Sequence, residues 1–162
     1  LKEAVSGDSS LFVRRSALEA LAQIDTAAAL PMIRVMLGVD SWTDIERSSA
    51  LHALSLTHSP DAFPLASHLV APSDSRFARL AALEPLVVSA RETGRQSDAA
   101  TELAPFLNDP DLYIREAVAQ SLGALAVPGS AGALESRKQV EAEGRVLTAI
   151  DDALTAIRSG KQ

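Results

Sequence analysis

Hydrophobic residues recur along this chain with the period of an amphipathic helix. Five segments place apolar residues at i, i+3, i+4 and i+7 or close to it, and they predict helices at about 10–23, 43–56, 75–91, 111–125 and 145–158. Second helices are predicted after the first four, at Thr26–Leu37, Pro60–Val70, Ser97–Leu107 and Ser130–Ala142. The pattern therefore predicts an all-α chain built from helix pairs.

The first four of these segments share a phrase of the form Arg-x-x-Ala-Leu-x-x-Leu, with Val-Ala in place of Ala-Leu in the fourth. Its arginines are Arg14, Arg47, Arg79 and Arg115, separated by 33, 32 and 36 residues. The fifth segment keeps the apolar pattern, but Leu147 stands where the other four have their aligned arginine. A phrase kept at this period predicts stacked repeats of one structural unit, with about four to five antiparallel helix pairs.

Polar residues ahead of the helices predict where they begin. Asp8-Ser9-Ser10 and Asp109-Pro110-Asp111 offer side-chain oxygens to the free amides of a first turn. Ser41 and Asp44 have the spacing of a capping box, with Asp in place of the usual Glu or Gln.

Glycine and proline predict where helices end or bend. Leu1–Gly7 is interpreted as the last turns of a second helix that stops at Gly7. Pro31 and Pro64 lie 33 residues apart in second helices, and we expect a bend at each. Pro85 falls inside the third first-helix, where we expect a kink.

Composition agrees with one helical domain over residues 1–162. Apolar residues make up 47% of the chain but aromatic residues only 4%, so the core is expected to consist of Leu, Ala, Val and Ile. The chain has no cysteine, which excludes disulfides, thiol chemistry and cysteine-ligated metals. A chain of this length needs neither a disulfide nor a structural metal to fold.

Charge and hydropathy argue against two classes of partner. The net charge of −6, with basic residues spread mostly singly, is not the clustered basic surface that a nucleic-acid backbone requires. No apolar run approaches 18 residues, so we expect no membrane span.

The chain contains no recognisable catalytic or metal-binding motif. His52, His58 and His68 do not have the spacing of a zinc site, and no serine lies in a Gly-x-Ser-x-Gly phrase. The glycine-bearing turn at 128–132 lacks the lysine of a phosphate-binding loop. We therefore expect no catalytic residue, no metal ligand and no cofactor in this chain.

Two features remain as candidates for contact. Arg14, Arg47, Arg79 and Arg115 are interpreted as a structural ladder between successive repeats, because the five donors of arginine suit such bridging; a binding ladder is the alternative. Trp42, the single tryptophan, either packs across a hairpin junction or anchors a partner.

The repeated phrase resembles HEAT repeats of the short bilin-lyase-like kind, over essentially the whole chain. The resemblance implies a curved α-solenoid, with first helices on its convex side and second helices on its concave side. Because such repeats serve many unrelated proteins, it carries little information about function.

The phrase from Asp40 to Leu51, centred on Trp42 and Arg47, is similar to the C-terminal helical domain of bacterial aminopeptidase-N-like zinc metallopeptidases. That resemblance implies a non-catalytic domain that helps enclose the peptide-binding cavity of its parent enzyme. The His-Glu-x-x-His motif of that family is absent from this chain, so any zinc would lie in another part of the parent. The alternative is an independent HEAT-repeat scaffold that binds another protein.

The two ends favour the first of these hypotheses. Leu1–Gly7 lacks a first helix of its own, so we expect more protein before it, and the polar Ser159–Gln162 suggests a nearby C-terminus. The sequence thus predicts a segment excised from the C-terminal part of a larger protein, whose partner is the remainder of its own polypeptide or another protein.

Overall fold

All regular structure in the described part of the chain is helical, which confirms the all-α prediction. A computed structural model describes residues 1–39, 44–72 and 74–160. Its internal contacts divide the chain into two compact units, Leu1–Ser89 and Ala90–Gln162. The boundary lies within one long helix, α6 (Arg76–Glu92). A single domain over 1–162 stays a prediction.

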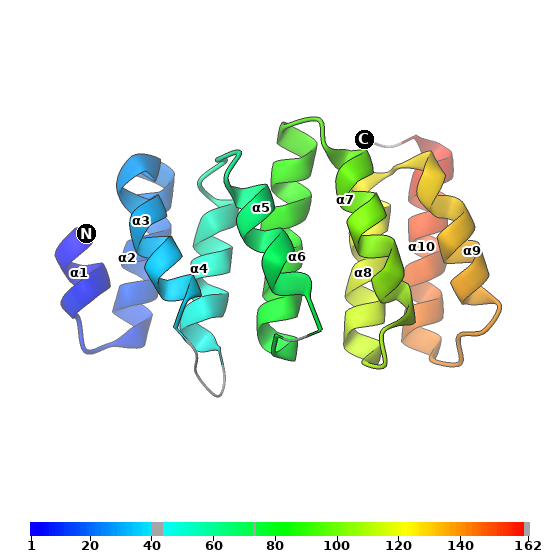
Figure 1. Ribbon diagram of the computed structural model, residues 1–162, viewed down its shortest axis with the longest axis horizontal. Helices are drawn as coiled ribbons and strands as arrows, with labels where there is room; N and C mark the ends of the chain where they lie inside the picture. Colours follow the sequence, from blue (N-terminus) through cyan, green and yellow to red (C-terminus); the bar gives the residue numbers. More distant parts are fainter. Residues whose placement is uncertain (40–43, 73, 161–162) are drawn as a thin grey trace. The chain divides into compact units, whose positions relative to one another are not determined.

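The first unit consists of α1 to α5, one 3-10 turn and most of α6. The helices are α1 (Lys2–Gly7), α2 (Leu11–Ile24), α3 (Thr26–Leu37), α4 (Ile45–Ser55), α5 (Ala62–Ser67) and the 3-10 turn η1 (His68–Val70). Helix α2 contacts α1, α3 and α4, and α3 also contacts α4. Figure 1 shows α2 and α4 side by side with α3 packed against them.

The core of the first unit is aliphatic, with a single buried aromatic ring at Phe63 among its described residues. Residues 2% exposed or less include Leu18, Ala22, Ile33, Leu51, Leu54 and Phe63. Leu18 belongs to the repeated phrase, and so do Ala50 and Leu51 one repeat later. The apolar period seen in the sequence is therefore the buried face of these helices.

The second unit contains the end of α6 and the remaining helices. These are α7 (Gln96–Leu103), the 3-10 turn η2 (Ala104–Asn108), α8 (Leu112–Leu125), the 3-10 turn η3 (Pro128–Ser130), α9 (Ala131–Lys138) and α10 (Gly144–Ser159). Helix α8 contacts both α7 and α10, and α9 packs on α10 and η2. In Figure 1, α8 and α10 lie side by side.

Helices α8 and α10 approach each other closely at Gly123. A Cβ atom built on Gly123 would lie 2.9 Å from Cα and 3.0 Å from Cβ of Ala153. Both residues are buried, and Val118, Leu122 and Ile150 fill the interface around them without exposure to solvent. The small side chains in these helices therefore serve close backbone packing, since no larger residue fits at this crossing.

The predicted first helices agree with α2, α4, α6, α8 and α10 to within one or two residues. Helix α3 covers the predicted range from Thr26 to Leu37, and both α3 and α6 continue through their internal prolines. The other second helices are shorter than predicted. Residues 68–70 and 104–108 are 3-10 turns, and Pro105 in the second of these has no N–H to donate to a longer helix.

Helix α9 ends at Lys138, although a helix to Ala142 was predicted. The carboxylate of Glu141 accepts hydrogen bonds from the backbone amides of Ala142 and Glu143, both at 3.0 Å. That local turn orients the carboxylate toward a buried arginine. A tertiary interaction, invisible to helix periodicity, thus ends the helix.

Two of the predicted start signals act as expected. Ser10 accepts from the amide of Val13 at the start of α2, and Asp111 accepts from Tyr113 at the start of α8. Asp8 and Asp109 each accept a hydrogen bond from the amide two residues later, at 2.8 and 2.9 Å. The same turn therefore precedes a first helix in each unit.

One other predicted signal is wrong. Asp44 is not inside a capping box: it precedes α4 with a left-handed backbone (φ 47°), and its side chain makes no cap hydrogen bond. The carboxylate of Asp44 instead contacts Arg47 and Ser75. Ser41, the other half of the predicted capping box, lies outside the described residues. The predicted stop of the first segment is confirmed, because Gly7 is the last residue of α1 and the extended Asp8 follows it.

Replacing Gly123 with alanine should lower the free energy of unfolding by about 2 kcal/mol, because the new methyl group forces α8 and α10 apart. Gly132 in α9 is the matched control: its Cβ would meet nothing within 4 Å. Gly132→Ala should therefore leave stability unchanged or raise it by up to about 1 kcal/mol. Urea unfolding followed by circular dichroism measures both, and equal effects of the two variants would refute the close-packing argument.

Candidate functional site

In the first unit, two ladder arginines tie a helix to the connection that precedes it. The Nε of Arg47 in α4 donates to the carbonyl oxygen of Leu37 at 3.1 Å. The Nε of Arg79 in α6 donates to the carbonyl oxygen of Val70 at 2.9 Å. Both carbonyls belong to the last residue of a preceding second helix or its 3-10 extension, where intrahelical donors have run out.

Arg47 also faces two carboxylates. Its Nη1 lies 3.6 Å from Asp44 and 3.5 Å from Asp74, which belongs to the connection before α6. The side chain of Asp44 is 1% exposed and also accepts a hydrogen bond from the hydroxyl of Ser75. These contacts join the start of α4 to the start of α6, one repeat further along the chain.

In the second unit, Arg115 contacts both backbone carbonyls and a carboxylate. Its Nη1 donates to the carbonyl oxygens of Asp109 and Pro110 at 2.9 and 3.1 Å. Its Nε and Nη2 donate to the two carboxylate oxygens of Glu141 at 2.8 and 3.0 Å. Arg137 donates to the same carboxylate at 2.9 Å. The side chain of Glu141 is 1% exposed, so this ion pair is shielded from solvent.

The hydrogen bond from Arg115 lowers the pKa of Glu141 to about 2 from its ordinary 4.5. Burial acts in the opposite direction, and the amide of Glu143 and the guanidinium of Arg137 add to the lowering. The same hydrogen bond raises the pKa of Arg115. Both groups are therefore charged at neutral pH, and their ion pair links α8 to the segment that follows α9.

Arg14 differs from the other three ladder arginines. Its Nη2 donates to Glu46 at the start of α4, again one repeat further along. Its Nε is buried and has no hydrogen-bond partner among the described residues. The corresponding Nε of Arg47, Arg79 and Arg115 each has an acceptor.

The histidines lie apart from one another. His52 in α4 stands between two carboxylates, with Nδ1 3.1 Å from Glu84 and Nε2 4.0 Å from Glu19. His58 has a left-handed backbone and His68 begins η1, and both are exposed. Within the described residues, no three His, Cys, Asp or Glu side chains converge as a metal site would require.

Trp42, the predicted contact residue, lies outside the described residues. Exposed apolar side chains occur elsewhere, at the starts of the first helices. Phe12, Ile45 and Phe77 each precede a ladder arginine by two residues, and they are 77%, 49% and 54% exposed. Phe77 and Ile45 line a surface hollow together with Arg15 and His52.

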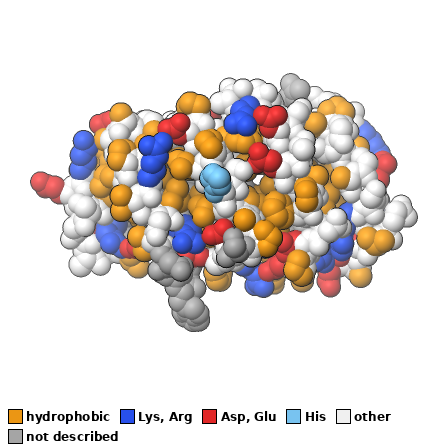
Figure 2. All heavy atoms as spheres, viewed as in Figure 1, with side chains coloured by type: hydrophobic (Ala, Val, Ile, Leu, Met, Phe, Trp, Pro, Cys, Tyr) orange, Lys and Arg blue, Asp and Glu red, His pale blue; other side chains and the backbone are white. Residues whose placement is uncertain are grey.

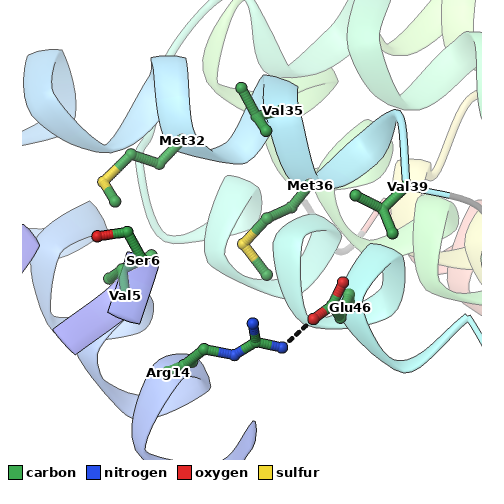
Figure 3. A pocket seen from close by; sticks show the side chains of 8 residues that line it. All are labelled: Val5, Ser6, Arg14, Met32, Val35, Met36, Val39 and Glu46. Carbon is green, nitrogen blue, oxygen red and sulfur yellow. Dashed lines mark hydrogen bonds and ion pairs between the residues drawn. The ribbon is translucent and has the colours of Figure 1, made fainter. Parts of the chain in front are cut away.

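The first unit contains an apolar groove of about 370 Å³ (Figure 3). We call it the methionine groove: Met32, Val35 and Met36 of α3 form one wall, and Val39 follows them. Val5 and Ser6 of α1 lie opposite, and the Arg14–Glu46 pair closes the floor. The chain has only two methionines, and both line this groove.

Sequence reasoning missed this groove. The signal available was the placement of Met32 and Met36 four residues apart, on one face of a helix. That spacing is equally typical of two buried core residues. Only the partial exposure of both methionine side chains in the structure shows that they line a groove.

Charges of both signs are mixed on the face of the molecule seen in Figure 2. Figure 2 shows Lys and Arg side chains interspersed with Asp and Glu on this face of each unit. Among the described residues, no helix is long and apolar enough to cross a membrane.

Comparison with models of known protein families found no match for this chain, and comparison with curated proteins likewise found none. The helical, repeat-like structure is therefore the basis for any proposal about function.

Replacing Glu141 with glutamine should lower the free energy of unfolding at pH 7 by about 3 kcal/mol, as the fall in its pKa from 4.5 to about 2 implies. A lowered pKa contributes stability above pH 4.5 that is lost as the pH falls toward 2. The gap between wild type and variant should therefore close over that range.

Glu135→Gln is the control, because Glu135 pairs with Arg158 at 55% and 68% exposure. It should change stability by less than about 1 kcal/mol. Urea unfolding at a series of pH values measures both variants. A gap for Glu141→Gln that stays constant from pH 7 to pH 2 would contradict the assignment of the buried ion pair.

Proposed function

We propose that this chain is a non-catalytic helical-repeat module that binds protein. In this proposal its helices form a HEAT-like α-solenoid of antiparallel pairs over residues 1–162. The repeat of arginine-centred phrases supports it, because the period of 32 to 36 residues continues across the whole chain. An all-helical structure with contacts between successive helices within each unit is the architecture that such a repeat requires.

The contacts of the charged side chains support a non-catalytic role. Three ladder arginines donate to backbone carbonyls or to carboxylates of neighbouring segments, namely Arg47, Arg79 and Arg115. Glu141, whose pKa is lowered to about 2, is paired with Arg115 and Arg137. The shifted pKa is therefore explained by structure, without a catalytic task for the residue.

The single observation that carries the proposal of protein binding is the methionine groove. Methionine side chains are flexible and polarisable, and they are common on surfaces that adapt to apolar partners. Val35 at the rim is 72% exposed, so apolar surface continues from the groove onto α3. An exposed apolar hollow of this kind is typical of interaction sites.

A narrower proposal names the partner as the rest of the same polypeptide. It rests on the similarity of residues 40–51, with Trp42, Arg47 and Leu51, to the C-terminal domain of aminopeptidase-N-like zinc metallopeptidases. In that case the zinc and the catalytic residues belong to the parent, and this module helps enclose its peptide-binding cavity. The independent scaffold that binds another protein is the alternative.

Site-specific photo-cross-linking in the full-length protein that carries this chain tests the general proposal. The photoreactive residue p-benzoylphenylalanine replaces Val35 at the groove or Phe77 on a first helix, and Val140 serves as control. Val35 and Val140 are matched in exposure, at 72% and 70%. We expect cross-links to protein from Val35 or Phe77 and few from Val140. No cross-link above the Val140 level from either position would refute a protein-binding module.

The identity of the cross-linked peptide separates the two partners. A peptide from the same polypeptide supports the appended domain, and one from another protein supports the independent scaffold. An aminopeptidase assay with zinc, on this chain and on its parent, completes the test. Activity in the parent alone supports the appended domain, whereas activity in this chain alone would overturn the non-catalytic proposal.

A further inference from the structure

Arg14 has hydrogen-bonding capacity that its own fold does not use. Within the described residues its only side-chain hydrogen bond is from Nη2 to Glu46. Its Nε is buried without a partner, and Figure 3 shows its other terminal nitrogen directed into the space below the methionines. The N–H donors that the protein presents at the floor of this largely apolar groove are therefore those of Nη1, because Nε is buried beneath the surface.

The other repeats show what the missing partner resembles. The guanidinium groups of Arg47 and Arg79 each donate to the carbonyl of the last residue of the preceding helix or 3-10 turn, and that of Arg115 donates to carbonyls of the preceding connection. At Arg14 the described residues supply no such carbonyl. The contacts of the other ladder arginines thus indicate that a backbone carbonyl oxygen is the acceptor that suits the guanidinium of Arg14.

The Arg14–Glu46 ion pair at the floor of the groove favours an uncharged ligand. Arg14 and Glu46 carry opposite charges and are paired, and the other lining side chains are neutral. A carboxylate brought to Arg14 would also approach Glu46 and be repelled by it. A neutral carbonyl meets the free donors of Arg14 without this penalty.

We propose that the methionine groove binds an uncharged apolar peptide segment of a protein, which packs its side chains against Met32, Met36 and Val35 and presents a backbone carbonyl to Arg14. This inference rests on the proposed function as a protein-binding module and specifies the chemistry of one site. The volume of about 370 Å³ lies within the range of about 300–1,000 Å³ typical of ligand pockets.

The two methionines provide a direct measurement of binding. A protein labelled with ¹³C at the methionine methyl groups has two methyl signals, and both come from this groove. The probe is the blocked tripeptide acetyl-Leu-Ala-Leu-amide. We expect it to shift both signals saturably, and the same peptide with a free terminal carboxylate to bind at least several-fold more weakly.

Two pairs of variants locate the contacts. Arg14→Lys keeps a cation for Glu46 but removes the second donor, and it should weaken peptide binding about tenfold. Arg15→Lys is its control on the neighbouring residue, which is not part of this groove and pairs with Glu19. Val35→Asp should abolish binding by placing a charge at the rim, whereas the equally exposed Val140→Asp should leave it unchanged.

Three results would overturn the inference: no saturable shift of either signal, equal weakening by Arg14→Lys and Arg15→Lys, or preference for the free carboxylate. Concentration-dependent shifts without peptide would identify a second copy of the chain as the occupant instead. If the peptide-binding tests fail but cross-links still form from Phe77, only the proposed peptide site is rejected, and the proposal of a protein-binding module is retained. Loss of cross-links at both Val35 and Phe77 would reject the function itself.

Discussion

The structure depends on how the carbonyl groups at the ends of its second helices are satisfied. A helix leaves its last carbonyls without intrahelical donors, and short connections bring those carbonyls into partly buried positions. Arg47 and Arg79 supply the donors from the following helix, to Leu37 and Val70. A guanidinium suits this role because it is always charged and carries several donors in one plane. One side chain thereby joins a helix end, a connection and a carboxylate.

Small residues are the second requirement of this architecture. The core contains mostly leucine, alanine and other aliphatic residues, so helices pack at short range and their contacts depend on small side chains. The approach of Gly123 to Ala153 is the clearest example, since a single methyl group would push α8 from α10. The low aromatic content thus follows from the close packing of helices, and the exposed aromatic residues Phe12, Phe77 and Tyr113 stand out against it.

The methionine groove arises where this scheme is incomplete. Arg14 retains its link to the next repeat through Glu46 but has no carbonyl for its Nε. At the same place the two methionines of the chain form an apolar wall. A position whose guanidinium donates to a backbone carbonyl in three repeats therefore lacks that contact in one. Our proposal of peptide binding at this groove builds on that difference.

The sequence by itself determined the helical class, the repeat and the positions of the first helices. Their apolar stripes and capping residues act within a few residues of each other, so local physical chemistry is sufficient. The tertiary structure decided the rest. Asp44 contacts Arg47 and Ser75 instead of capping a helix. Glu141, which was predicted to lie within the helix that ends at Lys138, pairs with Arg115. Only folding brought Met32 and Met36 beside Arg14, because the groove joins residues from separate helices and no local pattern encodes which side chains will meet.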